Sequence, residues 1–385
     1  MKVRCVALLA AGLMAVSVPP GCSTKPKSCE ERMLEASTTP GLPDGFAVLE
    51  GLGKVDYEKD WPKYIMNTRD GSIMVLVSPR SYMMGSLQET DETPPHKVTI
   101  GRFYMDMYEV NNAQFARYAK TFNKAHDKMC KELRHSCCPP KENEKRCPAF
   151  DSPCLADELL STLTPSTWAT RNWSVQNDEF MKSLPCCLPQ YVQPDLMHFK
   201  QYWSPAVNDS HPARAVSFFE AWYYCRWVGK DLPTEAEWEL AANGGDNRLY
   251  PWGDLEPDGQ HLLCNYGGDR PGEDGYVHTA PVSAFAKGRS PFGCYNMSGN
   301  VWEWCKDKYD ATIYSVADFA VGRGRQSELA RDMTDPKGPA FGDQRVIRGG
   351  AFTSGISTCR TTVREPCRPN NHGMNVGFRG VLRIR

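Results

Sequence analysis

Hydrophobic and polar residues alternate in the first third of the chain in a way that predicts short strands. Four segments are rich in β-branched and aromatic residues and are separated by Gly, Pro and Ser: residues 73–77, 82–86, 96–100 and 103–106. The pattern then changes to helical spacing, with Asn111 or Asn112 as the N-cap and Phe115 and Tyr118 on one face. The pattern predicts a small sheet followed by a helix.

Two more helices are predicted after residue 210. Residues 218–228 have helical spacing and are followed by Gly229, a residue that suits a helix C-terminus. Thr234 begins the next helix, because its side chain can accept the backbone N–H of Glu237 while the Glu237 side chain reaches back. Beyond residue 245 the chain has mostly short strands and turns. We therefore expect an α+β fold with low regular secondary structure, short strands and two main helices.

The N-terminus has the features of an export signal. A basic start and an apolar run at residues 5–18 are followed by Gly21 and Cys22, which resembles a bacterial lipoprotein cleavage site. The apolar run is too short to span a bilayer permanently. We expect residues 1–21 to be a signal peptide, Cys22 to be lipidated and residues 22–65 to form a tether. A plain secretory signal cut nearby is the alternative.

The charge balance and the cysteine content restrict the possible functions. The 385 residues include 45 Lys and Arg against 46 Asp and Glu, which gives no general attraction to nucleic acid. Sixteen cysteines are typical of an exported, oxidised protein. Without Cys5 and the lipidated Cys22, fourteen remain, compatible with up to seven disulfides. Seven of them lie in residues 121–205, which we expect to be a cysteine-rich insertion.

Five separated motifs identify a family resemblance. In chain order they are GKDLPTEAEWE at 229–239, YPWG at 250–253, GNVWEW at 299–304, RGG at 348–350 and GFR at 377–379. This set resembles the formylglycine-generating enzyme family, also called the sulfatase-modifying factor domain. The resemblance implies a C-type-lectin-like fold over residues 66–385, interrupted by the insertion. It also implies an O2-dependent copper oxidase that converts a cysteine of a client sulfatase into formylglycine.

The same resemblance implies structural calcium, which binds six to eight oxygen ligands. Two oxygen-rich loops match the family pattern. The first supplies side chains and backbone carbonyls from Asn265, Tyr266, Asp274 and Tyr276. The second supplies ligands from Asn296, Gly299, Val301 and Glu303, with carbonyls at the glycine and the valine. The alternative is that these are ordinary turn residues satisfied by backbone hydrogen bonds.

The catalytic positions depart from the family pattern. The enzyme holds copper with two cysteines after the Gly-Gly motif, and here those positions are Ser354 and Cys359. Cu(I) prefers soft thiolates, so a hydroxyl is a poor replacement. The family's serine after the Gly-Gly is Ala351. We therefore expect no copper, and Cys359 is the one remaining catalytic candidate, although in an oxidising compartment a disulfide is the favoured role for it.

Two hypotheses follow from these residues. The first is an envelope-anchored binding or scaffold protein that keeps the fold but lacks formylglycine-generating activity. It would be held at the membrane by the lipid on Cys22 and would bind an unknown protein or carbohydrate partner, but no nucleic acid. The second is an exported oxidoreductase of the same family that acts on a client cysteine or a small substrate through an altered metal site.

Overall fold

The computed structural model describes residues 41–49, 57–58, 61–119, 121, 209–257, 262–267, 272, 274–314 and 333–384. Cys22, the predicted signal peptide and nearly all of the predicted insertion at 121–205 lie outside this part of the chain. Within it, no helix is both long enough and apolar enough to cross a membrane.

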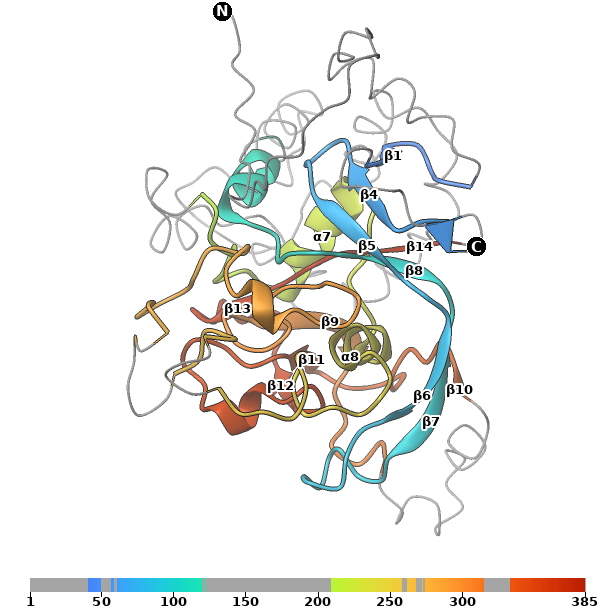
Figure 1. Cartoon of the computed structure of the whole chain (residues 1–385), viewed down its shortest axis with the longest axis vertical. Coiled ribbons are helices and arrows are strands. Elements are labelled where there is room, and N and C mark those ends of the chain that lie inside the picture. The colour runs from blue at the N-terminus through green and yellow to red at the C-terminus, as the bar shows by residue number, and fades with distance from the viewer. Residues whose placement is uncertain are drawn as a thin grey trace, which may run out of the picture.

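The largest sheet has five antiparallel strands in the order β1, β4, β5, β8, β14 (Figure 1). The strands are β1 (Phe46–Val48), β4 (Tyr64–Asn67), β5 (Ile73–Val77), β8 (Phe103–Asp106) and β14 (Val381–Arg383). A short hairpin, β2 (Tyr57–Glu58) with β3 (Trp61–Pro62), precedes β4. The predicted strands at 73–77 and 103–106 are confirmed. β1 and β2 lie within residues 22–65, the predicted tether, and β1 extends the main sheet by pairing with β4.

Two smaller sheets are also found in the described part of the chain. The three-stranded sheet has the order β10 (Met333–Thr334), β7 (His96–Ile100), β6 (Arg80–Met84). The four-stranded sheet has the order β12 (Arg364–Cys367), β11 (Arg345–Arg348), β9 (Trp302–Lys308), β13 (Val376–Gly377). β9 carries Trp302 and Trp304, which are buried in the core.

Two of the described helices begin at the caps predicted from the sequence, Asn111 and Thr234. Asn111 caps the helix whose described part covers residues 112–119, since its Oδ1 accepts the N–H of Gln114 at 2.9 Å. Ser217 caps α7 (Phe218–Trp227) and Thr234 caps α8 (Glu235–Asn243), each through a complete capping box. Two short 3₁₀ helices are η4 (Ala286–Gly288) and η5 (Ile356–Cys359). These elements make the expected α+β, C-type-lectin-like fold.

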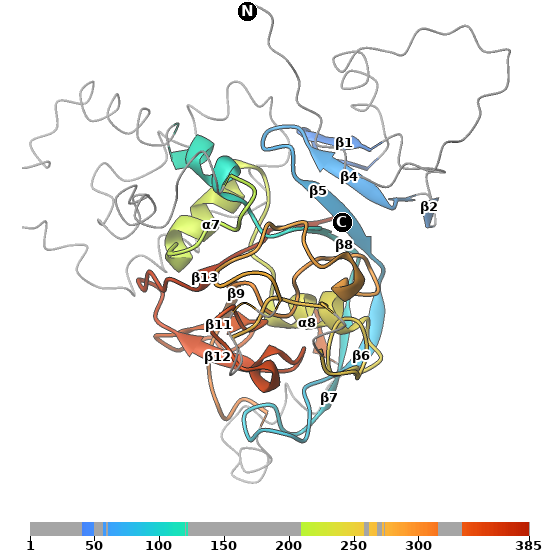
Figure 2. The same cartoon turned by 60° about the vertical axis from the view of Figure 1, so that its left-hand side comes forward.

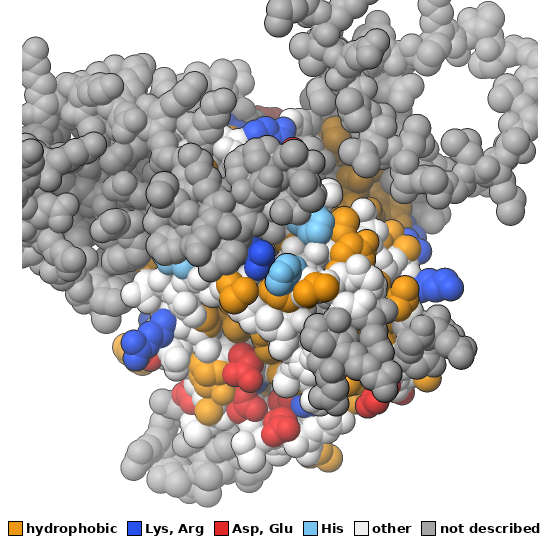
Figure 3. Space-filling view, turned by 90° about the vertical axis from the view of Figure 1, so that its left-hand side faces the viewer, with side chains coloured by type: hydrophobic (Ala, Val, Ile, Leu, Met, Phe, Trp, Pro, Cys, Tyr) orange, Lys and Arg blue, Asp and Glu red, His pale blue; other side chains and the backbone are white. Residues whose placement is uncertain are grey.

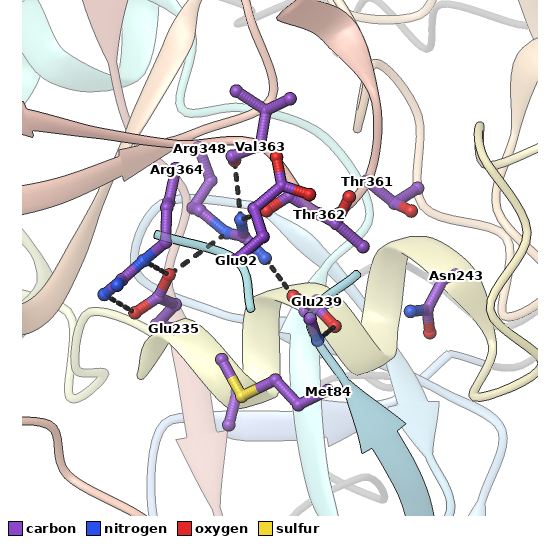
Figure 4. Close-up of polar contacts among 12 residues, drawn as sticks. Met84, Glu92, Glu235, Glu239, Asn243, Arg348, Thr361, Thr362, Val363 and Arg364 are labelled. Carbon is purple, nitrogen blue, oxygen red and sulfur yellow. Dashed lines mark hydrogen bonds and ion pairs between the residues drawn. The ribbon is translucent and has the colours of Figure 1, made fainter. Parts of the chain in front are cut away.

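Helix α8 lies at the centre of the molecule, and all nine of its residues are buried. It contacts β6 and β7 on one side and β9 and β11 on the other (Figures 1 and 2). Buried carboxylates need partners. Glu235 accepts two hydrogen bonds of 2.8 Å from Arg364, and Glu239 pairs with Arg348 (Figure 4). These ion pairs fix α8 against β11 and β12, and β11 leads directly into the candidate site.

Candidate functional site

The candidate site begins where β11 ends in the sequence Arg348-Gly349-Gly350. Both glycines have positive φ, +97° and +74°. A Cβ on Gly350 would lie 2.5 Å from Sγ of Cys359. Only glycine at position 350 therefore lets this turn pass over the thiol.

The Cys359 thiol is fully buried at the end of η5. Sγ lies 3.6 Å from the carbonyl oxygen of Gly355, to which it donates, and it faces the backbone N–H groups of Ala351 and Gly299. Burial raises the pKa of this thiol to about 12, although the two N–H groups act in the opposite direction. Because the thiolate is the nucleophile and the metal ligand, Cys359 must lose its proton to react or to bind a metal, and burial opposes that loss.

The other two catalytic positions lie on the same loop. The Ser354 hydroxyl accepts the N–H of Ala351 at 3.1 Å, so its oxygen stabilises the turn. The Ser354 carbonyl accepts the N–H of Gly267 at 2.8 Å. The structure thus brings together the three positions that the sequence analysis identified as catalytic in the family. In this chain they carry the methyl group of Ala351, the hydroxyl of Ser354 and the thiol of Cys359.

A second thiol, Cys264, comes from a segment that packs on this loop. Three residues further along this segment, Gly267 lies so close to Phe352 and Thr353 that a Cβ on Gly267 would be 2.5 Å from the Phe352 carbonyl oxygen. Burial raises the pKa of Cys264 well above its usual value, and the nearby Cys359 is the next cause. The sequence gives no spacing signal for this proximity, because the two cysteines are far apart along the chain.

Each of the six cysteines that the structure describes is a free thiol: Cys225, Cys264, Cys294, Cys305, Cys359 and Cys367. The disulfide that we expected for Cys359 is therefore wrong for this structure, since its sulfur faces backbone N–H groups instead of a bonded sulfur. Cys225 is a buried free thiol within the α7 core cluster. The expectation of up to seven disulfides is wrong as well, because with six of the fourteen cysteines free, at most four disulfides could form among the eight cysteines outside the described residues.

The first candidate calcium loop has one buried oxygen that lacks a donor. Asn265 Oδ1 is buried without a hydrogen-bond partner, while its Nδ2 donates to the His278 carbonyl at 2.8 Å. Asp274 accepts the N–H groups of Tyr266 at 3.2 Å and Tyr276 at 2.9 Å, which brings the four predicted residues together. Burial raises the pKa of Asp274, as expected for a carboxylate with no cation beside it. This donor set fits a hard cation such as Ca²⁺.

The second candidate calcium loop contains a carboxylate that the sequence analysis missed. Asn296 Oδ1 is also buried without a partner, and its Nδ2 donates to Glu109 at 2.9 Å. Asn300 donates to the other Glu109 oxygen at 2.7 Å. Burial raises the pKa of Glu109 to about 7. The only sequence signal was an acidic residue beside Val110, just before a helix cap.

The predicted ligand Glu303 has other partners in the structure. Its carboxylate accepts hydrogen bonds from Arg379 at 2.7 and 2.6 Å and from the Trp238 indole at 2.8 Å. Gly299 approaches the Asn265 carbonyl so closely that a Cβ would clash, and its N–H donates to Gly349. Val301 is fully buried beside them. The residues Glu109 and Asn296 therefore fit a cation at this loop better than Glu303 does.

These features define a class: a lectin-like α+β fold, a Gly-Gly turn over a buried cysteine, and oxygen-lined loops. The chain matches the sulfatase-modifying factor enzyme 1-like domain over residues 63–384 and belongs to this family. It is 42% identical over 327 residues to a formylglycine-generating enzyme of Thermomonospora curvata, covering 80% of this chain and 92% of that protein. It is 32% identical over 319 residues to the formylglycine-generating enzyme of Mus musculus, covering 80% of this chain and 74% of that protein.

A solved structure supports the fold. The chain resembles PvdO from Pseudomonas aeruginosa with a TM-score of 0.50 and 20% sequence identity, covering 83% of this chain and 97% of that one. Such a likeness concerns the fold alone. The α+β, formylglycine-generating-enzyme-like fold expected from the sequence motifs is thus confirmed, and so is the family.

Proposed function

We propose that this protein is a binding or scaffold member of the formylglycine-generating enzyme family that does not generate formylglycine. The observation that carries the proposal is the pair Ser354 and Cys359. The hydroxyl of Ser354 is held by the Ala351 N–H, and hydroxyl oxygen is a weak ligand for Cu(I). A single protonated thiol is a poor copper site. This protein therefore lacks a ligand pair for the copper ion on which the family's oxidase depends.

Calcium has a supporting role in this proposal. Asn296, which has an unpartnered oxygen, donates to the buried carboxylate of Glu109, and Asn265, which has another, precedes Tyr266, whose N–H donates to Asp274. When bound, calcium would neutralise these carboxylates and fix loops that have little regular secondary structure. Rigid loops suit a surface that binds a protein or a carbohydrate. The face shown in Figure 3 has hydrophobic side chains and histidines at its centre and acidic side chains below them.

The location is part of the same proposal. Gly21-Cys22 after the apolar run supports export and lipid anchoring at the bacterial cell envelope. Expressed in a bacterial host with lipoprotein processing, the protein should fractionate with membranes. Cys22→Ser should release it into the soluble fraction, whereas unchanged membrane association would contradict the anchor.

The activity test uses oxygen consumption. The copper-loaded protein is mixed with a peptide that contains one cysteine, and O2 uptake and aldehyde formation are followed. Wild type should show neither. Ser354→Cys, which restores the second thiol, serves as the matched variant for a gain of activity. Oxygen-dependent aldehyde formation by wild type would refute the proposal.

The alternative function is an oxidoreductase that uses Cys359 with a different partner. The observation that favours it is Cys264, a second buried free thiol on a segment that contacts the Ser354 loop. Should wild type be active in the oxygen assay, Cys264→Ser and Cys359→Ser should abolish that activity equally. Loss in Cys359→Ser alone would exclude a role for Cys264.

A further inference from the structure

A cavity of about 590 Å³ lies at the N-terminal end of α8, away from the Gly-Gly turn. Its walls come from β6, β7, β9, β10, α8 and the segment 336–341. One part is apolar, with Met84, Ile313, Met333 and Phe341. The other part is polar and includes His96, Asp307 and Tyr314. The volume is in the usual range for sites that hold small organic ligands.

His96 lines this cavity and carries an unused hydrogen-bond acceptor. Its Nδ1 lies 3.1 Å from the Pro94 carbonyl oxygen. Because a carbonyl only accepts, Nδ1 carries the proton and Nε2 has a free lone pair. Nε2 is buried and has no hydrogen-bond partner. The ring stacks on Tyr314 with centroids 4.3 Å apart, which fixes its orientation.

Asp307 presents a second acceptor and a negative charge. It is 3% exposed, and its Oδ2 accepts the N–H of Glu235 at 2.9 Å. Among the described residues, no Lys or Arg forms an ion pair with it. Burial and the nearby Glu235 raise its pKa to about 7. Within the part of the chain that the structure describes, the carboxylate is thus buried with one backbone hydrogen bond and without an ion-pair partner.

The other charges of the cavity are already neutralised or lie in solvent. Glu235 and Arg364 form a two-bond ion pair, with both distances 2.8 Å. Lys337 lies at the rim and is exposed. The polar side of the cavity therefore consists of the Asp307 carboxylate, the His96 imidazole with its unused acceptor and the Tyr314 ring, beside apolar walls.

We propose that this cavity binds a small molecule that carries a primary ammonium group on an apolar body. The ammonium would donate to Asp307 and to Nε2 of His96, and the apolar body would pack on Met84, Met333 and Phe341. A metal ion is a poorer occupant, because no three His, Cys, Asp or Glu side chains in the described part are arranged to share one. The proposal is independent of whether the Cys359 loop is active.

The test compares two probes of the same shape, 2-phenylethylamine and 2-phenylethanol, by calorimetric titration of the whole protein at pH 8. The amine should bind saturably, and the alcohol about 10- to 100-fold more weakly, as expected when a charge-assisted hydrogen bond is lost. Asp307→Asn keeps the acceptor for Glu235 but removes the charge. Asp307→Asn should weaken binding of the amine by a similar factor and abolish the preference for the amine over the alcohol.

Two further variants keep the test decisive. His96→Phe retains the ring contact with Tyr314 and removes the acceptor, so it should also weaken binding of the amine. Asp343→Asn removes an exposed carboxylate and should change nothing. Thermal melting establishes that each variant is folded. Equal affinity for amine and alcohol, no amine binding, amine binding unaffected by Asp307→Asn, or stoichiometric Zn²⁺ binding in place of the amine would each overturn the proposal.

Discussion

The buried ion pair between Glu303 and Arg379 gives the sharpest stability prediction. Both side chains are fully buried, with relative exposures of 0% and 0%. Arg379 makes two hydrogen bonds to the Glu303 carboxylate and also donates to the backbone carbonyls of Asp106, Met107 and Tyr295. The guanidinium therefore connects β8, the loop before β9, and β9 itself. Glu303→Gln preserves the size of the side chain, removes the charge and replaces one accepting oxygen with an NH2 group that cannot accept the Arg379 hydrogen bond.

The expected loss follows from leaving a buried cation without its partner. Breaking one side of a buried pair costs about 3–5 kcal/mol. We expect the lower end of this range for Glu303→Gln. Glu109 interacts electrostatically with Arg379 and would remain near it as a second carboxyl group. For a domain of this size, each kcal/mol lowers Tm by about 2–4 °C.

Equilibrium unfolding in guanidinium chloride, followed by tryptophan fluorescence in the presence of a calcium chelator, measures the effect. The matched control is Asp246→Asn. Its ion pair with Arg248 has side chains that are 54% and 27% exposed, and such pairs contribute about 0–1 kcal/mol. If Glu303→Gln changes the unfolding free energy by no more than this control, the buried pair is not a stabilising element of the fold and the reasoning fails.

Three further predictions concern calcium, the Gly-Gly turn and pH. Free Ca²⁺ at about 100 times its Kd should stabilise the protein by about 2.7 kcal/mol per site, and Asp274→Asn should remove one site's share of the Tm rise; a calcium-independent Tm would exclude both sites. Gly350→Ala should destabilise more than Gly71→Ala in chemical denaturation, because both have φ +74° but only at Gly350 does a Cβ meet Cys359; equal losses would refute the steric argument. Since native Asp307 keeps its proton to about pH 7, and the unfolded carboxyl loses it near 3.8, the native state binds more protons between these values. The contribution of Asp307 to stability should therefore fall as pH rises through this window, by at most about 1.4 kcal/mol per pH unit, and Asp307→Asn should lack this part of the pH dependence; identical pH profiles would contradict the raised pKa.

Local patterns in the sequence predicted local structure well. The capping boxes at Ser217 and Thr234 use residues three positions apart, so the sequence contains all the information that they require. The strands at 73–77 and 96–100 were recognisable because their hydrophobic residues are continuous or alternate. The motifs identified the family for the same reason, because each is a short run of adjacent residues.

Contacts between distant segments could not be predicted. Cys264 and Cys359 are brought near each other by backbone hydrogen bonds between loops, and no spacing along the chain encodes them. Glu109 contacts Asn296 and Asn300, which come from the other half of the sequence. The motif pointed to Glu303 as a calcium ligand, which stays a prediction, whereas the packing gives it Arg379 as its partner. Side-chain partners across a fold depend on packing, which one sequence does not reveal.

The most direct test of the central claim is a Cu(I) competition titration against a chelator of known affinity, under reducing and anaerobic conditions. The account predicts that wild type takes up no stoichiometric copper, and that Ser354→Cys gains one Cu(I) per protein, which Cys359→Ser in that background removes. Tight binding of one Cu(I) by wild type, lost in Cys359→Ser, would contradict it.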